Sequence, residues 1–422
     1  MKKISIIGMG YVGLPLAVAF QRHFNVTGFD LNQSRINELS NGLDTNNQIT
    51  KKRLYNCLRL SFTSNTKDLD DSDLFIVTVP TPIYKNKEPD LRHLIGACKL
   101  IGKKIKKNNI IIFESTVFPG CTENICGALI EKISKKKMNL DFFLAYSPER
   151  INVGDKKNTL EKITKIVGAS NKKTLINVSK IYSLIIKAGV YKCESIAVAE
   201  AAKVIENAQR DINIAFINEI GNIFNKLNIN LNSVLNAAST KWNFLNFKPG
   251  LVGGHCIGID PYYLTYISKK IGIKPRVIDA GRYTNDLMFK NLANHFHKIV
   301  SKNSYKKTKH VLILGLTFKE NTNDLRNSKI FDFCKHLKKK GYKISVYDPL
   351  VSSKIKNKNF TFYNKIKFNN KFNSVFFAVP HKIILNNLNK LGKFLGKDAL
   401  IFDLKNILNN NQIRSDLRIF KF

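Results

Sequence analysis

The sequence predicts an α/β fold in which two Rossmann-like doubly wound domains are joined by a long central helix. In the first half of the chain, short apolar segments alternate with amphipathic ones, as in βαβ units of a parallel sheet. A helical pattern then runs through residues 196–227 without proline, and the α/β alternation resumes at residue 310. We therefore expect three domains, at residues 1–195, 196–300 and 301–422.

The individual elements follow from apolar runs of strand length and from amphipathic stretches between them. The helix over 196–227 is too long for a crossover and suits a spine joining two domains. The expected strands are 4–7, 25–29, 74–79, 110–114 and 142–146 in the first domain, and 310–314, 343–347, 374–379 and 400–402 in the last. The expected shorter helices are 14–24, 91–104 and 328–340.

Composition restricts the class of protein. With 422 residues, 44% of them hydrophobic, the chain is long enough for two or three domains. It has no apolar run long enough to span a bilayer, so no membrane association is expected. The apolar N-terminus breaks at once into glycines and therefore predicts a buried strand rather than a signal peptide. Seven cysteines without a C-x-x-C pair predict reduced thiols and a cytoplasmic protein.

The formal net charge of +38 raises the possibility of a nucleic-acid partner. The lysines, however, are scattered over all expected helices and loops, and asparagine and isoleucine are abundant too. That pattern is more typical of drift toward AT-rich codons than of a selected binding face. We therefore expect no nucleic-acid partner, although a basic surface would favour a small anionic substrate.

A cofactor motif opens the chain. Residues 8–13 read G-x-G-x-x-G directly after the first strand, and Asp30 follows the second strand about 20 residues on, which predicts a dinucleotide site. Asp30 would bind a ribose diol and repel a 2′-phosphate, favouring NAD, whereas nearby Arg35 would favour NADP. The expected contacts from this region are Gly8, Gly10, Tyr11, Val12, Gly13, Asp30 and Arg35.

Two later strands end in residues that suit the same site. Thr81 and Thr116 follow the third and fourth expected strands, at the carboxyl edge of the sheet where cofactor and substrate meet. Both are predicted cofactor contacts, although threonine at a strand end is also an ordinary turn residue.

The glycine-rich segment 250–263 contains the candidate nucleophile. Cys256 lies in a turn that can pack closely on a ligand, and a thiolate attacks carbonyl carbon well. The alternative is a buried structural cysteine. Neighbouring His255 would point the opposite way in an extended loop, so we expect it to pack or to contact substrate. Asp260 is a candidate base, or a group that positions water or Lys203, and its alternative is a turn or helix cap.

The spine helix offers a pair of donors. Lys203 and Asn207 are spaced i, i+4, which places an ammonium and an amide on one helix face where they could stabilise an oxyanion. The alternative is a solvated helix face. Arg326, after the first strand of the last domain, suits a sugar diphosphate, and Lys319 would join it. No His, Cys or Asp cluster has metal-ligand spacing, so no metal is expected.

Five motifs occur in order along the chain: the glycine fingerprint, Ser-Pro-Glu-Arg-Ile-Asn at 147–152, Ala-Glu-Ala-Ala-Lys-Val-Ile-Glu-Asn at 199–207, the cysteine loop, and Leu-Thr-Phe-Lys-Glu-Asn…Asp-Leu-Arg-Asn at 316–327. Together they resemble the UDP-glucose/GDP-mannose dehydrogenase family over essentially the whole chain. The resemblance implies an NAD-binding first domain, a central dimerisation domain with the cysteine loop, and a UDP-sugar-binding last domain. It also implies a homodimer whose spine helices pack together.

The resemblance implies a four-electron oxidation of a primary alcohol to a carboxylate with two NAD⁺. Cys256 would hold the aldehyde as a thiohemiacetal and then carry a thioester. Glu149 would serve as acid and base in hydrolysis, and Thr116 would hold the water between Glu149 and Asp260. The implied catalytic residues are Cys256, Lys203, Asp260, Asn207, Glu149 and Thr116. The implied substrate contacts are Glu149, Arg150, Asn152, Lys203, Asn207, Gly253, Arg326 and Lys319.

Within the family, the loop Gly-Gly-His-Cys-Ile-Gly-Ile-Asp-Pro-Tyr-Tyr resembles the branch that oxidises UDP-N-acetylhexosamines, and residues 241–245 look most like the enzymes of Vi-type capsular polysaccharide synthesis. The expected substrate is UDP-N-acetylglucosamine (UDP-GlcNAc) or UDP-N-acetylgalactosamine (UDP-GalNAc), for a capsule or O-antigen. The alternatives are the same chemistry on UDP-N-acetylmannosamine (UDP-ManNAc), UDP-glucose or GDP-mannose, a single-step 3-hydroxyacid dehydrogenase, and a nucleotide-sensing protein without activity.

Overall fold

The structure is a computed structural model that describes residues 3–150, 159–254, 256–303, 309–352, 355–369, 371–409 and 413–422. The chain folds as two compact units. The first unit comprises Met1–Glu206 and Tyr262–Lys274, and the second comprises Asn207–Pro261 and Pro275–Phe422. The chain passes from one unit to the other three times: within α7 (Ile196–Leu227), within α9 (Asp260–Lys270), and between Lys274 and Pro275.

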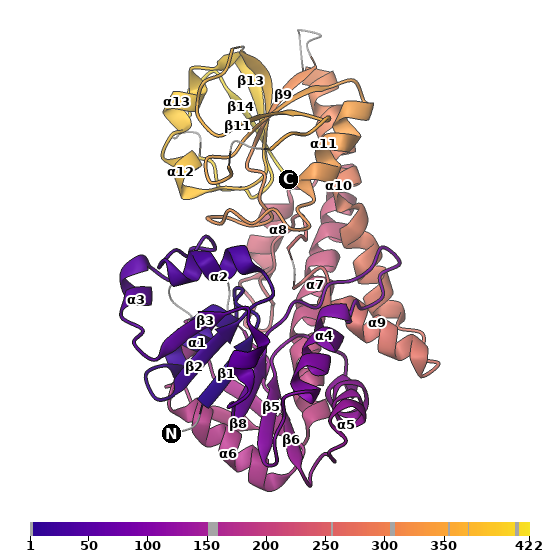
Figure 1. The fold of residues 1–422 in the computed structure, drawn as a ribbon. Coiled ribbons are helices and arrows are strands. Elements are labelled where there is room, and N and C mark those ends of the chain that lie inside the picture. The colour runs from indigo at the N-terminus through magenta and orange to yellow at the C-terminus, as the bar shows by residue number, and fades with distance from the viewer. Residues whose placement is uncertain are drawn as a thin grey trace. The chain divides into compact units, whose positions relative to one another are not determined.

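The first unit is built on an eight-stranded sheet with the strand order β3-β2-β1-β4-β5-β6-β7-β8 (Figure 1). The first six strands are parallel, β7 is antiparallel to β6, and β8 is parallel to β7. Its strands are β1 (Lys3–Ile7), β2 (Asn25–Phe29), β3 (Leu60–Thr63), β4 (Leu74–Val77), β5 (Asn109–Phe113), β6 (Phe142–Tyr146), β7 (Lys165–Ala169) and β8 (Val190–Lys192). Its helices, besides parts of α7 and α9, are α1 (Gly13–Phe20), α2 (Gln33–Ser40), α3 (Lys51–Tyr55), α4 (Arg92–Gly102), α5 (Ala128–Ser134) and α6 (Lys172–Ser183).

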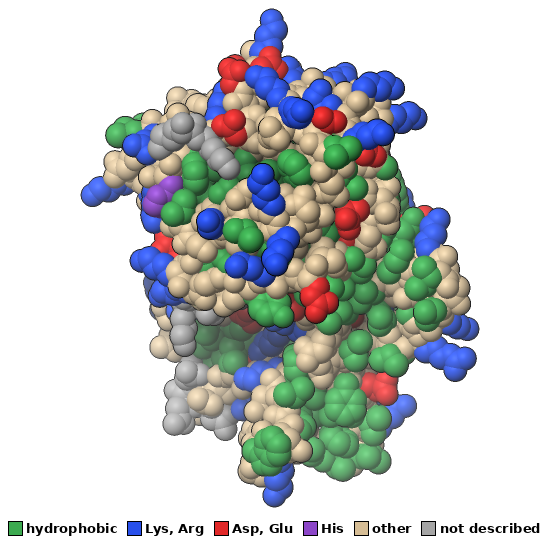
Figure 2. All heavy atoms as spheres, turned by 90° about the horizontal axis from the view of Figure 1, so that it is seen from below, with side chains coloured by type: hydrophobic (Ala, Val, Ile, Leu, Met, Phe, Trp, Pro, Cys, Tyr) green, Lys and Arg blue, Asp and Glu red, His purple; other side chains and the backbone are tan. Residues whose placement is uncertain are grey.

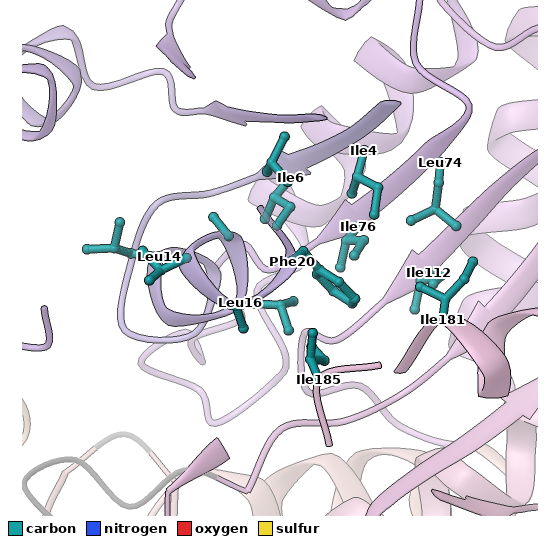
Figure 3. Close-up of a cluster of buried hydrophobic side chains, with 14 of the residues drawn as sticks. Ile4, Ile6, Leu14, Leu16, Phe20, Leu74, Ile76, Ile112, Ile181 and Ile185 are labelled. Carbon is teal, nitrogen blue, oxygen red and sulfur yellow. The ribbon is translucent and has the colours of Figure 1, made fainter. Parts of the chain in front are cut away.

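Alternate residues of the central strands form one side of this unit's core (Figure 3). Ile4 and Ile6 of β1 and Ile76 of β4 pack in one buried cluster with Phe20 of α1 and Ile181 of α6. The period of two in a strand puts these side chains on one face, so α1 and α6 cover the same face of the sheet. Burying each large aliphatic side chain stabilises the fold by about 1.5–3 kcal/mol. The core therefore fixes the carboxyl ends of β1 and β4 beside the start of α1.

The second unit contains a six-stranded sheet in which all neighbouring strands are parallel, with the order β11-β10-β9-β12-β13-β14. This repeats the order 3-2-1-4-5-6 of the first unit and gives the doubly wound arrangement a second time. The strands are β9 (His310–Leu314), β10 (Lys343–Tyr347), β11 (Thr361–Tyr363), β12 (Phe372–Phe377), β13 (Leu395–Asp403) and β14 (Arg418–Lys421). Helices of this unit are α8 (Leu231–Ala238), α10 (Arg276–Asn303), α11 (Ile330–Lys339), α12 (Lys382–Leu385) and α13 (Leu388–Gly392).

The predicted fold class is confirmed, with two Rossmann-like sheets and a long helix at 196–227. Several predicted ends are wrong by a few residues; α1, for example, ends at Phe20 because residues 21–24 turn directly into β2. The division into three domains at residues 195 and 300 stays a prediction. On the face shown in Figure 2, lysine and arginine side chains are dispersed among uncharged ones rather than gathered in a single stripe. Among the described residues, no helix is both long and apolar enough to cross a membrane.

Candidate active site

The glycine fingerprint forms a tight turn between β1 and α1. Gly8 has a φ of +103°, which an L side chain rarely adopts, and a Cβ on Gly13 would lie 1.9 Å from the carbonyl oxygen of Gly8. A Cβ on Gly10, in contrast, would meet no atom within 4 Å. Gly8 and Gly13 are thus required by the turn itself, whereas Gly10 leaves open space beside the backbone. No side chain caps the N-terminus of α1 at Val12, so its N–H groups suit the pyrophosphate of a dinucleotide.

Asp30 and Arg35 set the character of the ribose site. The carboxylate of Asp30 accepts hydrogen bonds from the backbone N–H groups of Met9, at 2.8 Å, and Asn32, at 2.9 Å. The guanidinium of Arg35 is buried, donating to the Met9 carbonyl at 3.0 Å and to Asp44 at 2.7 Å. Arg35 thus holds the glycine turn and is neutralised by a carboxylate, whereas Asp30 places negative charge at the end of β2. This arrangement fits NAD better than NADP.

Replacing Asp30 with alanine is expected to raise the dissociation constant for NADH by roughly 10- to 100-fold, because hydrogen bonds to a charged group are lost. Titration of the bound dinucleotide's fluorescence measures this without any sugar substrate. Asp71→Ala, which removes a carboxylate that is 81% exposed, is the matched control. Unchanged NADH affinity in the Asp30 variant would contradict the assignment.

The other predicted cofactor contacts lie at the carboxyl edge of the same sheet. Thr81 is buried, and its carbonyl oxygen accepts a hydrogen bond of 2.8 Å from the hydroxyl of Tyr263 in α9. Thr116 is half-buried in the loop after β5. The buried carboxylate of Glu200 in α7 fixes the end of that loop by accepting the N–H groups of Gly120, at 2.5 Å, and Thr122, at 2.8 Å. Tyr11 and Val12 are half-buried in the glycine turn.

Glu149 lies in a buried ionic cluster in the first unit. The ammonium of Lys165 is 2.9 Å from a carboxylate oxygen of Glu149 and 2.8 Å from one of Glu114, and the hydroxyl of Tyr182 donates to the other oxygen of Glu114. The Nζ of Lys203 donates to the Glu149 carbonyl oxygen at 2.9 Å. Lys203, predicted from the sequence, therefore contacts Glu149. Sequence analysis missed Lys165 and Tyr182, and the only available signal was an uncompensated pair of glutamates after two buried strands.

The charges of this cluster influence one another. Burial raises the pKa of Glu114, although the ammonium of Lys165 opposes the change. Burial alone would lower the pKa of Lys165, but the carboxylates of Glu114 and Glu149 raise it above its usual value. Lys165 is therefore held as a cation between two carboxyl groups.

The second unit holds the cysteine loop. Cys256 is exposed, whereas the other six of the seven cysteines are buried, and none is in a disulfide. Its carbonyl oxygen accepts the N–H groups of Ile259 and Asp260, at 3.1 and 2.9 Å, in a turn that leads into α9. Asp260 is 2% exposed, and its carboxylate accepts a hydrogen bond of 2.5 Å from the amide of Asn207 in α7. The structure thus brings Asn207 and Asp260 together, with Lys203 one turn earlier on the same helix.

The burial of α7 decides between the two interpretations of its donors. Lys203 is 7% exposed and Asn207 is fully buried, so the alternative of a solvated helix face is wrong. An ammonium and an amide held in this way are suitable donors to a developing oxyanion.

The cysteine loop packs directly on the motif that follows β9. A Cβ on Gly253 would lie 2.8 Å from the Asn327 carbonyl oxygen, and a Cβ on Gly254, which has a φ of +79°, would lie 2.6 Å from the ring of Phe318. The amide of Asn327 also donates to the Gly254 carbonyl at 3.2 Å. Both glycines are therefore required by close approach, and two motifs distant in sequence form one surface.

A cavity of about 180 Å³ lies at the carboxyl ends of β9, β12 and β13. Since β9 and β12 flank the point where the strand order reverses, this is where doubly wound sheets bind ligands. Its lining includes residues 250–253, 317–320 and 328–330, together with Lys248, Val379 and Lys405. A second cavity of about 350 Å³ shares Lys248, Leu404 and Lys405 and adds the asparagines Asn232, Asn236, Asn246 and Asn406.

These cavities suit an anionic ligand with several hydrogen-bonding groups. Lys248, Lys319, Lys329 and Lys405 line the smaller cavity, against one carboxylate, Glu320. Burial lowers the pKa of Lys405, and a bound anion would reverse that effect. Lys405, which sequence analysis missed, follows β13 as Lys319 follows β9.

Arg326 is placed differently from the expectation. Its guanidinium donates three hydrogen bonds to the Asp324 carboxylate, at 3.0, 3.0 and 2.6 Å. It does not line the cavity, whereas Lys319 and Gly253 do. Its contact with substrate stays a prediction. Arg150 pairs with Glu206 at 2.6 Å. Asn152 and His255 lie outside the described residues. Within the described ranges, no group of three or more His, Cys, Asp and Glu side chains could hold a metal ion.

Comparisons with known proteins agree with this geometry. The chain matches the UDP-glucose/GDP-mannose dehydrogenase family in its NAD binding domain at residues 2–186, its central domain at 197–287 and its UDP binding domain at 312–410. Protein CapL of Staphylococcus aureus is 46% identical, with 100% of this chain and 99% of that protein covered. The UDP-N-acetyl-D-glucosamine 6-dehydrogenase of Salmonella typhi is 45% identical, with 99% and 98% covered.

A solved structure of a UDP-D-ManNAc dehydrogenase from Pyrococcus horikoshii superposes with a TM-score of 0.88 at 27% identity, covering 99% of this chain and 98% of that one. The family match assigns NAD binding to the domain at residues 2–186 and UDP binding to the domain at residues 312–410. The predicted cofactor is confirmed. The chain belongs to the UDP-glucose/GDP-mannose dehydrogenase family of NAD-dependent nucleotide-sugar oxidoreductases.

Proposed function

We propose that the protein oxidises the C6 hydroxyl of a UDP-N-acetylhexosamine, UDP-GlcNAc or UDP-GalNAc, to the uronic acid through a Cys256 thiohemiacetal and thioester. The observation that carries the proposal is the exposed Cys256 thiol in the turn that leads to the buried Asp260–Asn207 pair. A reactive aldehyde released between two oxidations would be lost, so a covalent holder is needed. The product is an aminouronic acid for a capsule or O-antigen, made in the cytoplasm.

Bound NAD⁺ supplies the hydride acceptor for each of the two oxidations. In the first, Asp260, or Lys203 positioned by it, takes the C6 hydroxyl proton. The Cys256 thiolate then forms a C–S bond to the aldehyde carbon, and the resulting oxyanion receives hydrogen bonds from Lys203 and Asn207. In the second oxidation the thiohemiacetal becomes a thioester.

Hydrolysis releases the acid. Glu149 takes a proton from a water molecule held by Thr116, the water oxygen attacks the thioester carbon, and the C–S bond breaks to regenerate the Cys256 thiolate. The 2.9 Å contact between the Lys165 ammonium and the buried Glu149 carboxylate supports the role of Glu149 as a base, because it holds the carboxylate in one place. Lys319, Lys405 and Gly253 bind the nucleotide diphosphate and sugar in the second unit, with Arg150, Asn152 and Arg326 as further contacts.

The relatives support an acetamido sugar. Proteins from Salmonella typhi and Pseudomonas aeruginosa that carry the name UDP-N-acetyl-D-glucosamine 6-dehydrogenase are both 45% identical to this chain. Five archaeal relatives that carry the name UDP-N-acetyl-D-mannosamine dehydrogenase are 29–33% identical to this chain. UDP-ManNAc is therefore the second candidate, and UDP-glucose and GDP-mannose follow.

The test is NADH production by the purified protein with each nucleotide sugar in turn. We expect two NADH per sugar on UDP-GlcNAc or UDP-GalNAc, together with a uronic acid in the mass spectrum of the product. One NADH per substrate would indicate a single-step dehydrogenase. Activity confined to UDP-glucose would overturn the choice of an acetamido sugar.

We further propose that the protein is a homodimer through α7. Phe216, Ile223 and Leu227 are 58%, 47% and 60% exposed and recur at helical spacing on one face of this helix. An apolar stripe of this kind is typical of a protein–protein interface. Ile223→Asp is expected to convert the dimer to a monomer in sedimentation velocity, because a charge would be buried there. Leu58→Asp, at an apolar residue that is 91% exposed outside α7, should leave the dimer intact.

A further inference from the structure

The cluster around Lys165 contains more carboxyl groups than cations. Glu114, Glu149 and Lys165 are 4%, 8% and 4% exposed. One ammonium lies between two carboxyl groups at 2.8 and 2.9 Å, so full ionisation would leave a net negative charge in a buried site. Such a charge is costly, and the usual outcome is that one carboxyl group keeps a proton.

The surroundings of the two carboxyl groups differ. Glu149 also accepts a hydrogen bond of 2.6 Å from the backbone N–H of Arg150, so its two oxygens have two different donors. Glu114 is buried more completely, and burial raises its pKa. Its other oxygen accepts a hydrogen bond from Tyr182, whose own pKa burial and Glu114 raise well above the usual value, so Tyr182 remains a donor.

Among the described residues, two further charged groups near Glu149 are Lys203 of α7 and the neighbouring Arg150. Lys203 contacts the Glu149 carbonyl oxygen at 2.9 Å, and Arg150 pairs with Glu206 at 2.6 Å. Within the described ranges, the Lys165 ammonium, on β7, bonds the Glu149 carboxylate itself.

We propose that Lys165 is a positioning residue that holds the Glu149 carboxylate in place as the base for hydrolysis, and that Glu114 holds the spare proton of the cluster. This rests on the proposed function, because it assigns a role to a residue that supports Glu149. When the pH falls, the first proton goes to Glu114, and the Glu149–Lys165 pair persists. Activity is then retained to a lower pH than a lone buried glutamate would allow.

The test is the pH profile of kcat for three variants. Lys165→Met is expected to move the acid limb to higher pH by one unit or more, because Glu149 loses its counter-charge. Glu114→Gln is expected to leave the limb at or below its wild-type position, and Lys165→Arg to keep it in place. Thermal unfolding of each variant separates loss of fold from loss of activity. An acid limb that stays in place in Lys165→Met, or rises equally in Glu114→Gln, would overturn the proposal.

If Lys165→Met does not fold, the double variant Lys165→Met/Glu114→Gln removes one negative charge with the positive one. The acid limb of its kcat profile should still lie at a higher pH than that of the wild type. An acid limb at the same pH as in the wild type would overturn the proposal. A second readout does not depend on turnover. In the wild type, we expect an infrared band of a protonated carboxyl group that persists above the pH at which ordinary glutamates are deprotonated. This band should be absent in Glu114→Gln.

The two proposals fail separately. If the wild type oxidises no nucleotide sugar, the proposed function fails, and the infrared band still decides which carboxyl group carries the proton. If turnover is as proposed but the band persists unchanged in Glu114→Gln, the placement of the proton is wrong.

Discussion

Replacing Cys256 with serine is expected to lower the rate of acid formation by roughly 10³-fold or more, because an alcohol is a much weaker nucleophile toward the aldehyde. The first oxidation does not need the thiol, so bound aldehyde should accumulate and the yield should fall below two NADH per sugar. Rapid-quench analysis of the enzyme-bound products measures both effects. Unchanged turnover in this variant would refute covalent catalysis by Cys256.

The same residue can be tested chemically, because the structure separates it from the other thiols. Cys256 is exposed and the remaining six cysteines are buried, so iodoacetamide should modify the native protein at one site. Modification of Cys256 should abolish acid formation. Bound nucleotide sugar should slow the modification. Cys193→Ser, at a buried cysteine of the first unit, is a matched control that should retain activity and the same labelling.

Replacing Lys203 with methionine is expected to lower kcat by roughly 10²- to 10³-fold, because a hydrogen-bond donor to the developing oxyanion is lost. The side chain is 7% exposed and its Nζ donates to the Glu149 carbonyl at 2.9 Å, so methionine fills similar space without the charge. Steady-state kinetics should show a smaller change in KM for the sugar than in kcat. Lys226→Met, at an exposed lysine of the same helix, should have no effect on either.

A result in which KM rises and kcat is unchanged would show that Lys203 contributes equally to ground-state and transition-state binding. Its role in stabilising an oxyanion would then be wrong. Retention of full activity would show that Lys203 has no catalytic role.

The central strands of both sheets were predictable because they are buried runs of aliphatic and aromatic residues. The strands toward the sheet edges, β3, β7, β8, β11 and β14, were not predicted, and apart from β7 none of them has a buried residue. The strands at 25–29, 142–146, 310–314 and 343–347 have the predicted bounds. Helix α10 was harder, since glycine and polar residues interrupt its sequence. Its buried residues Met288, Leu292, Phe296 and Val300 nevertheless recur every four positions, and this period was the signal that could have revealed it.

The residues of the candidate site also fall into those that the sequence predicts and those that it does not. Glycines, Asp30 and Cys256 were predictable because their chemistry is tied to local motifs. Lys165 and Lys405 were not, because nothing in a lysine-rich sequence distinguishes a buried lysine from an exposed one. Only the fold shows that Lys165 lies between two carboxyl groups and that Lys405 lines a cavity. The spacing of Lys203 and Asn207 predicted a shared face, but not the bond between Asn207 and Asp260.

The continuity of α7 limits how this enzyme can be taken apart or recombined. One boundary between the two compact units falls between Glu206 and Asn207, inside this 32-residue helix. A chimera joined at that point would combine the lysine of one parent with the asparagine of another within a single helical turn. A cut there would also leave helix ends with unsatisfied backbone groups on both fragments. Exchange of specificity between relatives should therefore keep all of α7 from one parent.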